Sequence, residues 1–188
     1  MRLFTSLYAG CFGRDADVEG GNTPLSVNSS IDAQRISSPC VFCDVSRAKG
    51  FNIVWEDECF TVFADRNPAA AHHLLVIPKI HIGKRGSSSV QSYSKTVDRM
   101  AEIGHHVLDD LKVPASSRRL GFHIPPFFSV NHLHMHAQGL PYRSTARALK
   151  YHVSSGSRGH DKGFSWFCEA KQAIHILENG GRIRILPC

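Results

Sequence analysis

No apolar run in this sequence approaches the ~20 residues that a helix needs to cross a bilayer, so no membrane-spanning segment is expected. The sequence also contains no internal repeat. Among its 188 residues, hydrophobic residues make up 42% and charged residues 20%. These shares are close to globular averages and exclude a wholly disordered, collagen-like or coiled-coil chain. The length suits one domain, with room for a disordered tail.

A disulfide framework is absent too, because the six cysteines are widely spaced and only Cys40 and Cys43 lie close together. Their Cys-x-x-Cys spacing is that of one half of a structural zinc site. A redox pair and two buried thiols are the alternatives, and the redox pair is disfavoured because no βαβ pattern follows. The formal net charge of +6 favours anionic partners such as nucleotides, nucleic acids or acidic surfaces.

The N-terminal part of the chain differs in composition from the rest. Residues 13–38 are rich in Gly, Asp, Asn and Ser and have no sustained apolar period. We therefore expect a flexible segment at 1–38 and one domain at 39–188. The first twelve residues are only faintly signal-like, and acidic residues follow closely. The expected location is cytoplasmic, nuclear or both, with mitochondria less favoured.

Hydrophobic patterning from residue 51 onward predicts an α+β domain. Apolar residues recur at helical spacing between 97 and 111, after a polar loop at 86–94. A second amphipathic helix is expected at 166–178, before Gly180 and Gly181, and a long basic connection at 139–163. Strands are predicted at 51–65 (two, around an acidic turn), 73–78, 119–124, 130–138 and 182–186. The expected architecture is an antiparallel sheet of about five strands with a long helix and a C-terminal helix.

Three histidines alternate with apolar residues along the strand predicted at 130–138. His132, His134 and His136 are two residues apart, so a strand would place all three side chains on one face. Three protonated imidazoles in such proximity would repel one another, so some must be neutral near pH 7. A neutral imidazole can act as a nucleophile, a base or a metal ligand. The alternative is a histidine-rich surface strand without chemistry, which strict alternation on a core-like strand makes harder to accept.

These residues resemble the signature of the histidine triad superfamily, His-φ-His-φ-His-φ-φ with φ apolar, except that Gln138 replaces the last apolar residue. The segment from His73 to His81 (HLLVIPKIH) is similar to a second hallmark strand of that superfamily, and Asp65-Arg-Asn-Pro-Ala-Ala to its nucleotide-binding turn. The resemblance runs from about Cys40 to the C-terminus. It is strongest to the third branch of histidine triad nucleotide-binding proteins and next strongest to the catalytic domain of aprataxin.

The resemblance implies a role for each matching residue. His134 matches the nucleophile that attacks the α-phosphorus of a nucleotide, and His136 matches the residue that holds the phosphate and its developing charge. Ser129 matches a serine that contacts the phosphate or the leaving group. His123 matches an aprataxin histidine that helps the leaving group depart, although a packed strand histidine is the alternative. Phe127 and Phe128 replace the usual Gly-Gln, which is a departure from the family pattern at the phosphate loop.

The resemblance also implies a nucleotide site and a metal site. Asp65 would accept hydrogen bonds from the ribose hydroxyls, Phe63 would flank the base, and His73 would support the triad. The expected nucleotide-binding residues are Phe63, Asp65, Arg66, His73, Ser129 and Asn131. The Cys2His2 set for structural Zn²⁺ would consist of Cys40, Cys43, His81 and His132.

The expected function is that of a nucleotide hydrolase that releases AMP from amine or acyl leaving groups, such as phosphoramidates, AMP-lysine or aminoacyl adenylates. The expected partner is a conjugate of a purine nucleoside monophosphate. Two alternatives are an aprataxin-like removal of AMP from adenylated 5′ DNA ends and a non-catalytic nucleotide-binding scaffold. Nucleic acid is a less favoured partner, and no membrane is expected. A homodimer is the oligomeric state that the nucleotide-binding branches imply, whereas aprataxin acts as a monomer.

Overall fold

The computed structural model describes residues 40–82 and 90–188, and Cys40–Cys188 forms one compact unit. The flexible segment predicted at 1–38 lies outside the described residues, as do residues 86–89 of the polar loop predicted at 86–94. Residues 90–94 of that predicted loop belong to a helix. Across the described ranges, no helix is long and apolar enough to cross a membrane.

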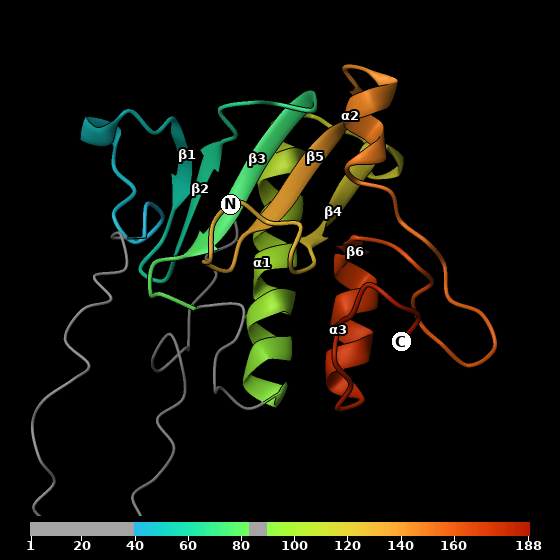
Figure 1. The fold of residues 1–188 in the computed structure, drawn as a ribbon. Coiled ribbons are helices and arrows are strands. Elements are labelled where there is room, and N and C mark those ends of the chain that lie inside the picture. The colour runs from blue at the N-terminus through green and yellow to red at the C-terminus, as the bar shows by residue number, and fades with distance from the viewer. Residues whose placement is uncertain (1–39, 83–89) are drawn as a thin grey trace, which may run out of the picture. The chain divides into compact units, whose positions relative to one another are not determined.

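The centre of the unit is a six-stranded sheet in which every neighbouring pair is antiparallel (Figure 1). Its order is β1-β2-β3-β5-β4-β6. The strands are β1 Ile53–Glu56, β2 Phe60–Ala64, β3 Ala70–Pro78, β4 Arg118–His123, β5 Met135–Tyr142 and β6 Phe167–Glu169. The predicted α+β class is confirmed, with six strands in place of about five.

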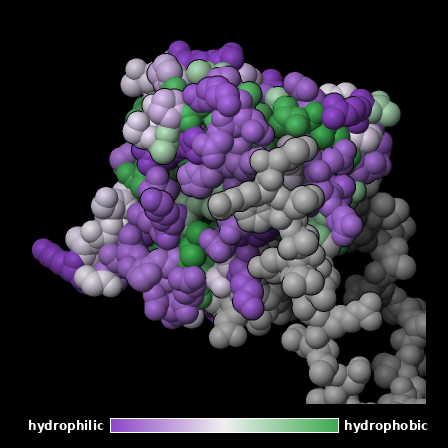
Figure 2. Space-filling model, turned by 180° about the vertical axis from the view of Figure 1, so that it is seen from behind, coloured by the Kyte–Doolittle hydropathy of each residue, from purple (hydrophilic) through white to green (hydrophobic). Residues whose placement is uncertain are grey.

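Two helices cover one face of this sheet. They are α1, Val90–Asp110, and α3, Ala170–Glu178, which pack against each other and against the central strands (Figure 1). The main core fills the space between helices and sheet, where Met100, Met135 and Ala173 are fully buried. Packing is tight at Gly104, where an added Cβ would lie 2.8 Å from the Met135 methyl group. Viewed from behind, the surface is mainly hydrophilic, and hydrophobic residues occupy smaller separate areas (Figure 2).

The opposite face of the sheet carries two smaller apolar clusters. One joins Phe42 to Phe63 and Leu75, and the other joins Tyr151 to Phe167. A short helix, α2 Thr145–Leu149, follows β5 and lies within the stretch predicted to be irregular. Because Met135 and Ala137 are buried in the helix-facing core, the alternating His136 lies on this second face.

Two expectations about strands are corrected by the structure. The triad strand begins only at Met135, so His132 and His134 lie in an irregular segment that leads into β5. Residues 182–186 form no strand. Their alternating pattern instead reflects the packing of Ile183 and Ile185 against the core. This C-terminal segment also bonds to the loop before β6, where the Ser165 N–H donates to the Ile185 carbonyl.

Candidate functional site

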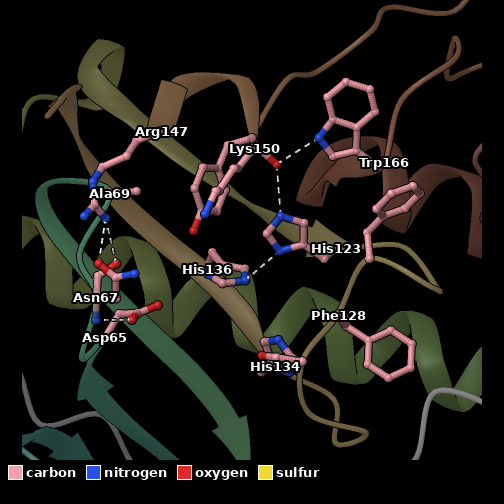
Figure 3. A pocket seen from close by; sticks show the side chains of 13 residues that line it. Asp65, Asn67, Ala69, His123, Phe128, His134, His136, Arg147, Lys150 and Trp166 are labelled. Carbon is pink, nitrogen blue, oxygen red and sulfur yellow. Dashed lines mark hydrogen bonds between the residues drawn. The ribbon is translucent and has the colours of Figure 1, made fainter. Parts of the chain in front are cut away.

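A pocket of about 310 Å³ opens on the face of the sheet opposite the helices. The turn after β2, the ends of β4 and β5, α2 and the residue before β6 all contribute to its wall (Figure 3). The lining residues are Asp65, Asn67, Ala69, His123, Phe127, Phe128, Ser129, His134, His136, Arg147, Lys150, Tyr151 and Trp166. All four residues expected to be catalytic are therefore brought to one cavity.

His134 lies in the irregular segment before β5, and its side chain is 4% exposed. Its Nδ1 lies 2.7 Å from the His132 carbonyl oxygen, which can only accept a hydrogen bond. Nδ1 therefore carries a proton, and in the neutral ring Nε2 keeps its lone pair. The Phe42 ring packs edge-on against His134, with ring centroids 5.5 Å apart, and restricts its orientation. This geometry provides an oriented, unprotonated imidazole nitrogen, which is what nucleophilic attack requires.

His73, His136 and His123 form a continuous hydrogen-bonded chain beneath the pocket. His73 Nε2 lies 2.9 Å from His136 Nδ1, and His136 Nε2 lies 3.0 Å from His123 Nδ1. The Ala69 N–H donates to His73 Nδ1 at one end, and His123 Nε2 faces the Lys150 carbonyl oxygen, 2.9 Å away, at the other. Because the first end supplies only a donor and the second only an acceptor, the neutral rings all carry their proton on Nε2.

Burial keeps His73 neutral in this chain. Its side chain is fully buried, and desolvation lowers its pKa to about 4, although the neighbouring Asp65 carboxylate opposes the shift. His123 and Arg147 lower the pKa further. A neutral His73 donates from Nε2 to His136. The Gln138 amide nitrogen lies 3.3 Å from the same His73 nitrogen, but both groups are donors in this tautomer, so this contact is not a hydrogen bond. Gln138 Oε1 accepts from the Tyr142 hydroxyl at 3.2 Å, which satisfies the polar residue that departs from the triad signature.

The lowered pKa of His73 predicts acid destabilisation. An unfolded histidine binds a proton near pH 6.5, whereas folded His73 does so only near pH 4. As pH falls through this window, the unfolded state binds more protons, and the free energy of unfolding falls by on the order of 3 kcal/mol. Urea denaturation at pH 7 and pH 4.5 measures this loss. His73→Gln should reduce the difference between the two pH values, whereas exposed His160→Gln should not. An unchanged pH difference in His73→Gln contradicts the assignment.

The turn Asp65–Ala69 is held between the sheet and α2. Asp65 Oδ1 accepts from the Asn67 N–H at 2.8 Å, which closes the turn locally. The Arg147 guanidinium of α2 donates to Asn67 Oδ1 at 2.8 Å and to the Pro68 carbonyl at 3.0 Å. Asp65 and Asn67 consequently present polar groups at a fixed edge of the pocket, opposite His123 and Trp166 (Figure 3).

The other residues expected to bind nucleotide lie at different distances from the cavity. Ser129 is exposed and lines the pocket, and His73 lies directly behind it. Phe63 is buried away from the lining, and its ring contacts Phe42, which itself touches His134. Arg66 and Asn131 are exposed and do not line this pocket.

Cys40, Cys43, His81 and His132 converge at the side of the sheet next to the triad. Their ligand atoms all lie within 4.8 Å of one another. Cys40 Sγ is 3.4 Å and Cys43 Sγ 3.7 Å from His132 Nδ1, and Cys43 Sγ is 3.1 Å from His81 Nδ1. A tetrahedral zinc ion with ordinary bond lengths needs S···N separations of about 3.5 Å. His132 Nε2 faces the Pro78 carbonyl at 2.9 Å, which leaves Nδ1 unprotonated for a metal. The set therefore fits zinc.

A second group, Asp65, His73 and His136, also has ligand atoms within 4.8 Å of one another. The Ala69 N–H donates to His73 Nδ1 and so keeps a proton on His73 Nε2, the nitrogen that a metal would need. This group is therefore better described as a hydrogen-bonded relay than as a metal centre.

Several pocket residues were missed by reasoning from the sequence. Trp166 lies in the segment predicted to be a helix but precedes β6 and lines the cavity, and Tyr151 lies in the connection predicted to be irregular. The Tyr151 ring lies 5.1–5.5 Å from His73, His123 and His136, centroid to centroid. The signal available in the sequence was the basic character of the connection at 139–163, because Arg147 and Lys150 both reach the pocket.

Comparison with known proteins gives consistent matches. Residues 39–152 match the family described as scavenger mRNA decapping enzyme C-term binding. The adenosine 5′-monophosphoramidase HINT3 of Danio rerio is 33% identical over 150 residues, which cover 78% of this chain and 87% of that protein. The bifunctional adenosine 5′-phosphosulfate phosphorylase/adenylylsulfatase HINT4 of Arabidopsis thaliana is 37% identical over 62% of this chain and 80% of that protein.

Two further comparisons are more distant. The aprataxin of Ciona intestinalis is 26% identical over 70% of this chain, but the match covers 33% of aprataxin. The crystal structure of a HIT family hydrolase from Legionella pneumophila Philadelphia 1 superposes with a TM-score of 0.50 and 24% identity, over 57% of this chain and 98% of that one. The latter supports the fold.

Proposed function

Because the chain belongs to the histidine triad superfamily and is a hydrolase, we propose that it releases AMP from a phosphoramidate or acyl adenylate through a nucleotidyl-His134 intermediate. The observation that carries this proposal is the bond from His134 Nδ1–H to the His132 carbonyl, which leaves His134 Nε2 unprotonated in the pocket. The relatives named adenosine 5′-monophosphoramidase support the same substrate class.

The reaction takes place in two displacements. His134 Nε2 attacks the α-phosphorus, the bond from phosphorus to the leaving nitrogen or oxygen breaks, and an amine leaving group takes a proton from solvent water as it departs. Water then attacks the same phosphorus and gives up a proton to solvent, the phosphorus–His134 bond breaks, and AMP is released. His136 lies 5.4 Å from His134, centroid to centroid, and Ser129 lines the same wall. The Ser129 hydroxyl and the His136 Nε2–H, which a phosphoryl oxygen would share with His123 Nδ1, stabilise the charge that develops on the phosphoryl oxygens.

The nucleoside occupies the side of the pocket formed by the Asp65–Ala69 turn. Asp65 accepts one backbone hydrogen bond through Oδ1, and its remaining lone pairs accept from ribose hydroxyls. Phe63 supports the base through Phe42, since Phe63 is buried and Phe42 stands between it and His134. We assign no direct contact to Arg66 or Asn131, because both are outside the pocket lining.

Zinc is the proposed ion of the Cys40–Cys43–His81–His132 set. When bound, zinc supplies a structural cross-link and no step of the reaction. It fixes His132, whose carbonyl orients His134. The four residues join the N-terminal end of the described domain to the segments after β3 and before β5.

Removal of AMP from adenylated DNA is the second candidate, and the observation in its favour is the pair of cations, Arg147 and Lys150, on the pocket wall. Both side chains could approach a phosphate of a nucleic acid. The Arg147 guanidinium, however, already donates to Asn67 and Pro68. We therefore favour small leaving groups.

A comparison of two substrates separates these candidates. We expect kcat/KM for AMP-lysine to exceed that for a 5′-adenylated DNA strand by at least about tenfold, since the pocket binds a small amine without a requirement for polynucleotide contacts. Release of AMP from each is measured with purified full-length protein, beside His134→Ala. A higher value for adenylated DNA overturns the preference. Binding of AMP without turnover of either substrate would instead support the nucleotide-binding scaffold.

A further inference from the structure

One backbone carbonyl, that of Lys150, accepts hydrogen bonds from two side chains of the pocket. The Trp166 indole N–H donates to it at 3.2 Å, and also to the Leu149 carbonyl at 3.1 Å. His123 Nε2 lies 2.9 Å from the same Lys150 oxygen. Figure 3 shows the indole and the imidazole meeting at this atom, with His136 beyond His123. A carbonyl oxygen has two lone pairs, so both donors can be satisfied together.

Trp166, His123 and Lys150 come from three different segments of the chain. Lys150 is the C-terminal cap of α2, Trp166 immediately precedes β6, and His123 ends β4. The Trp166 carbonyl accepts from the Ile124 N–H at 2.9 Å, which ties Trp166 to the strand that carries His123. The indole bond therefore fixes the end of α2 at one position relative to β4.

The position of the Lys150 carbonyl decides where the His123 proton lies. An acceptor opposite Nε2 holds the proton there and leaves Nδ1 free to accept from His136 Nε2, 3.0 Å away. His136 then keeps Nδ1 unprotonated toward His73, whose own tautomer is set by the Ala69 N–H. If the carbonyl moved, His123 could adopt the other tautomer and place its N–H against that of His136.

We infer that Trp166 is a positioning residue for the reaction: through the Lys150 carbonyl, it holds the His123 tautomer whose Nδ1 accepts from His136 Nε2–H. This inference rests on the proposed function for its kinetic consequence, whereas its structural consequence can be measured without turnover. Trp166 acts on the chemistry only through His123.

A double-mutant cycle tests this dependence. Trp166→Phe keeps an aromatic ring and removes the N–H donor, and we expect it to lower kcat for an adenosine phosphoramidate about threefold to tenfold with little change in KM, as for the loss of one hydrogen bond. In the His123→Ala background, the same substitution should have no further effect. Phe164→Ala, at an exposed aromatic residue outside the pocket lining, is the matched control and should keep wild-type kcat. Additive losses in the double variant would overturn the inference.

The histidine tautomers give a readout that does not depend on activity. In ¹⁵N NMR spectra of the full-length protein, His123 and His136 should each show a single Nε2–H tautomer. Trp166→Phe should shift His123 toward a mixture, whereas His136, whose Nδ1 accepts from His73, should keep its tautomer. Unchanged ring-nitrogen shifts in Trp166→Phe would refute the positioning role, whatever the kinetics. If the tautomers respond as expected but no AMP is released by wild type, the proposed function fails while the positioning role stands.

Discussion

Replacement of His134 by alanine is expected to lower kcat/KM for an adenosine phosphoramidate by on the order of 10⁴-fold or more, as for other covalent nucleophiles. The reason is geometric. In the pocket, His134 has a proton on Nδ1, held by the His132 carbonyl at 2.7 Å, and an unprotonated Nε2. His136 cannot substitute for it, because both of its ring nitrogens are engaged with His73 and His123.

Mass spectrometry of protein quenched during turnover provides the direct measurement. Wild type should carry an AMP adduct that maps to His134, and the alanine variant should carry none. His160→Ala, at an exposed histidine outside the pocket, is the control and should retain the adduct and the rate. Because a buried substitution can also disturb folding, His134→Gly with added imidazole is a second test. Partial recovery of AMP release by imidazole would identify the missing group as the nucleophile. An adduct on another residue would refute the mechanism.

The three triad histidines could be predicted from the sequence because they lie only two residues apart along the chain. Alternation of His132, His134 and His136 with apolar residues indicates one face of a strand, and Met135 and Ala137 are indeed buried on the opposite face. The strand itself starts later than predicted. Before Met135, hydrogen bonds run to the loop after β3, where the Leu133 N–H donates to the Ile82 carbonyl at 2.7 Å. Periodicity alone does not distinguish this irregular segment from a paired strand.

The far wall of the pocket could not be predicted in the same way. Arg147, Lys150, Tyr151 and Trp166 lie in a stretch with little periodicity, and contacts distant in sequence place them. Arg147 bonds to Asn67, 80 positions earlier, and Trp166 bonds to the end of α2. The tail is similar: Lys162 is fully buried, and its ammonium donates to the Ser165 and Ile185 carbonyls. Nothing in the sequence marks a lysine that is buried with only carbonyl partners. From the sequence alone, the alternating residues 182–186 therefore predict a strand.

Loss of the metal site is the second large expected effect, and it concerns stability. We expect purified protein to contain one zinc per chain, and Cys40→Ser/Cys43→Ser to contain almost none, since two of the four ligands are then removed. The free energy of unfolding should fall by on the order of 4 kcal/mol, and Tm by about 8–16 °C for a domain of this size. The N-terminal end of the domain would lose its cross-link to the segment before β5, while the core under α1 and α3 would remain.

Metal analysis and calorimetry measure both quantities, and Cys188→Ser, at a free cysteine outside the set, should change neither. Activity should fall with the metal, because zinc on His132 Nδ1 fixes the residue whose carbonyl accepts from His134 Nδ1–H. The double serine variant should therefore lose kcat even below its own Tm, and added zinc should not restore it. Added zinc should restore both Tm and kcat to chelator-treated wild type. Wild type that contains no metal and keeps its Tm in chelator would show that the four residues form a thiol–imidazole hydrogen-bond cluster, and that His132 is positioned without metal, by the bond from its Nε2–H to the Pro78 carbonyl.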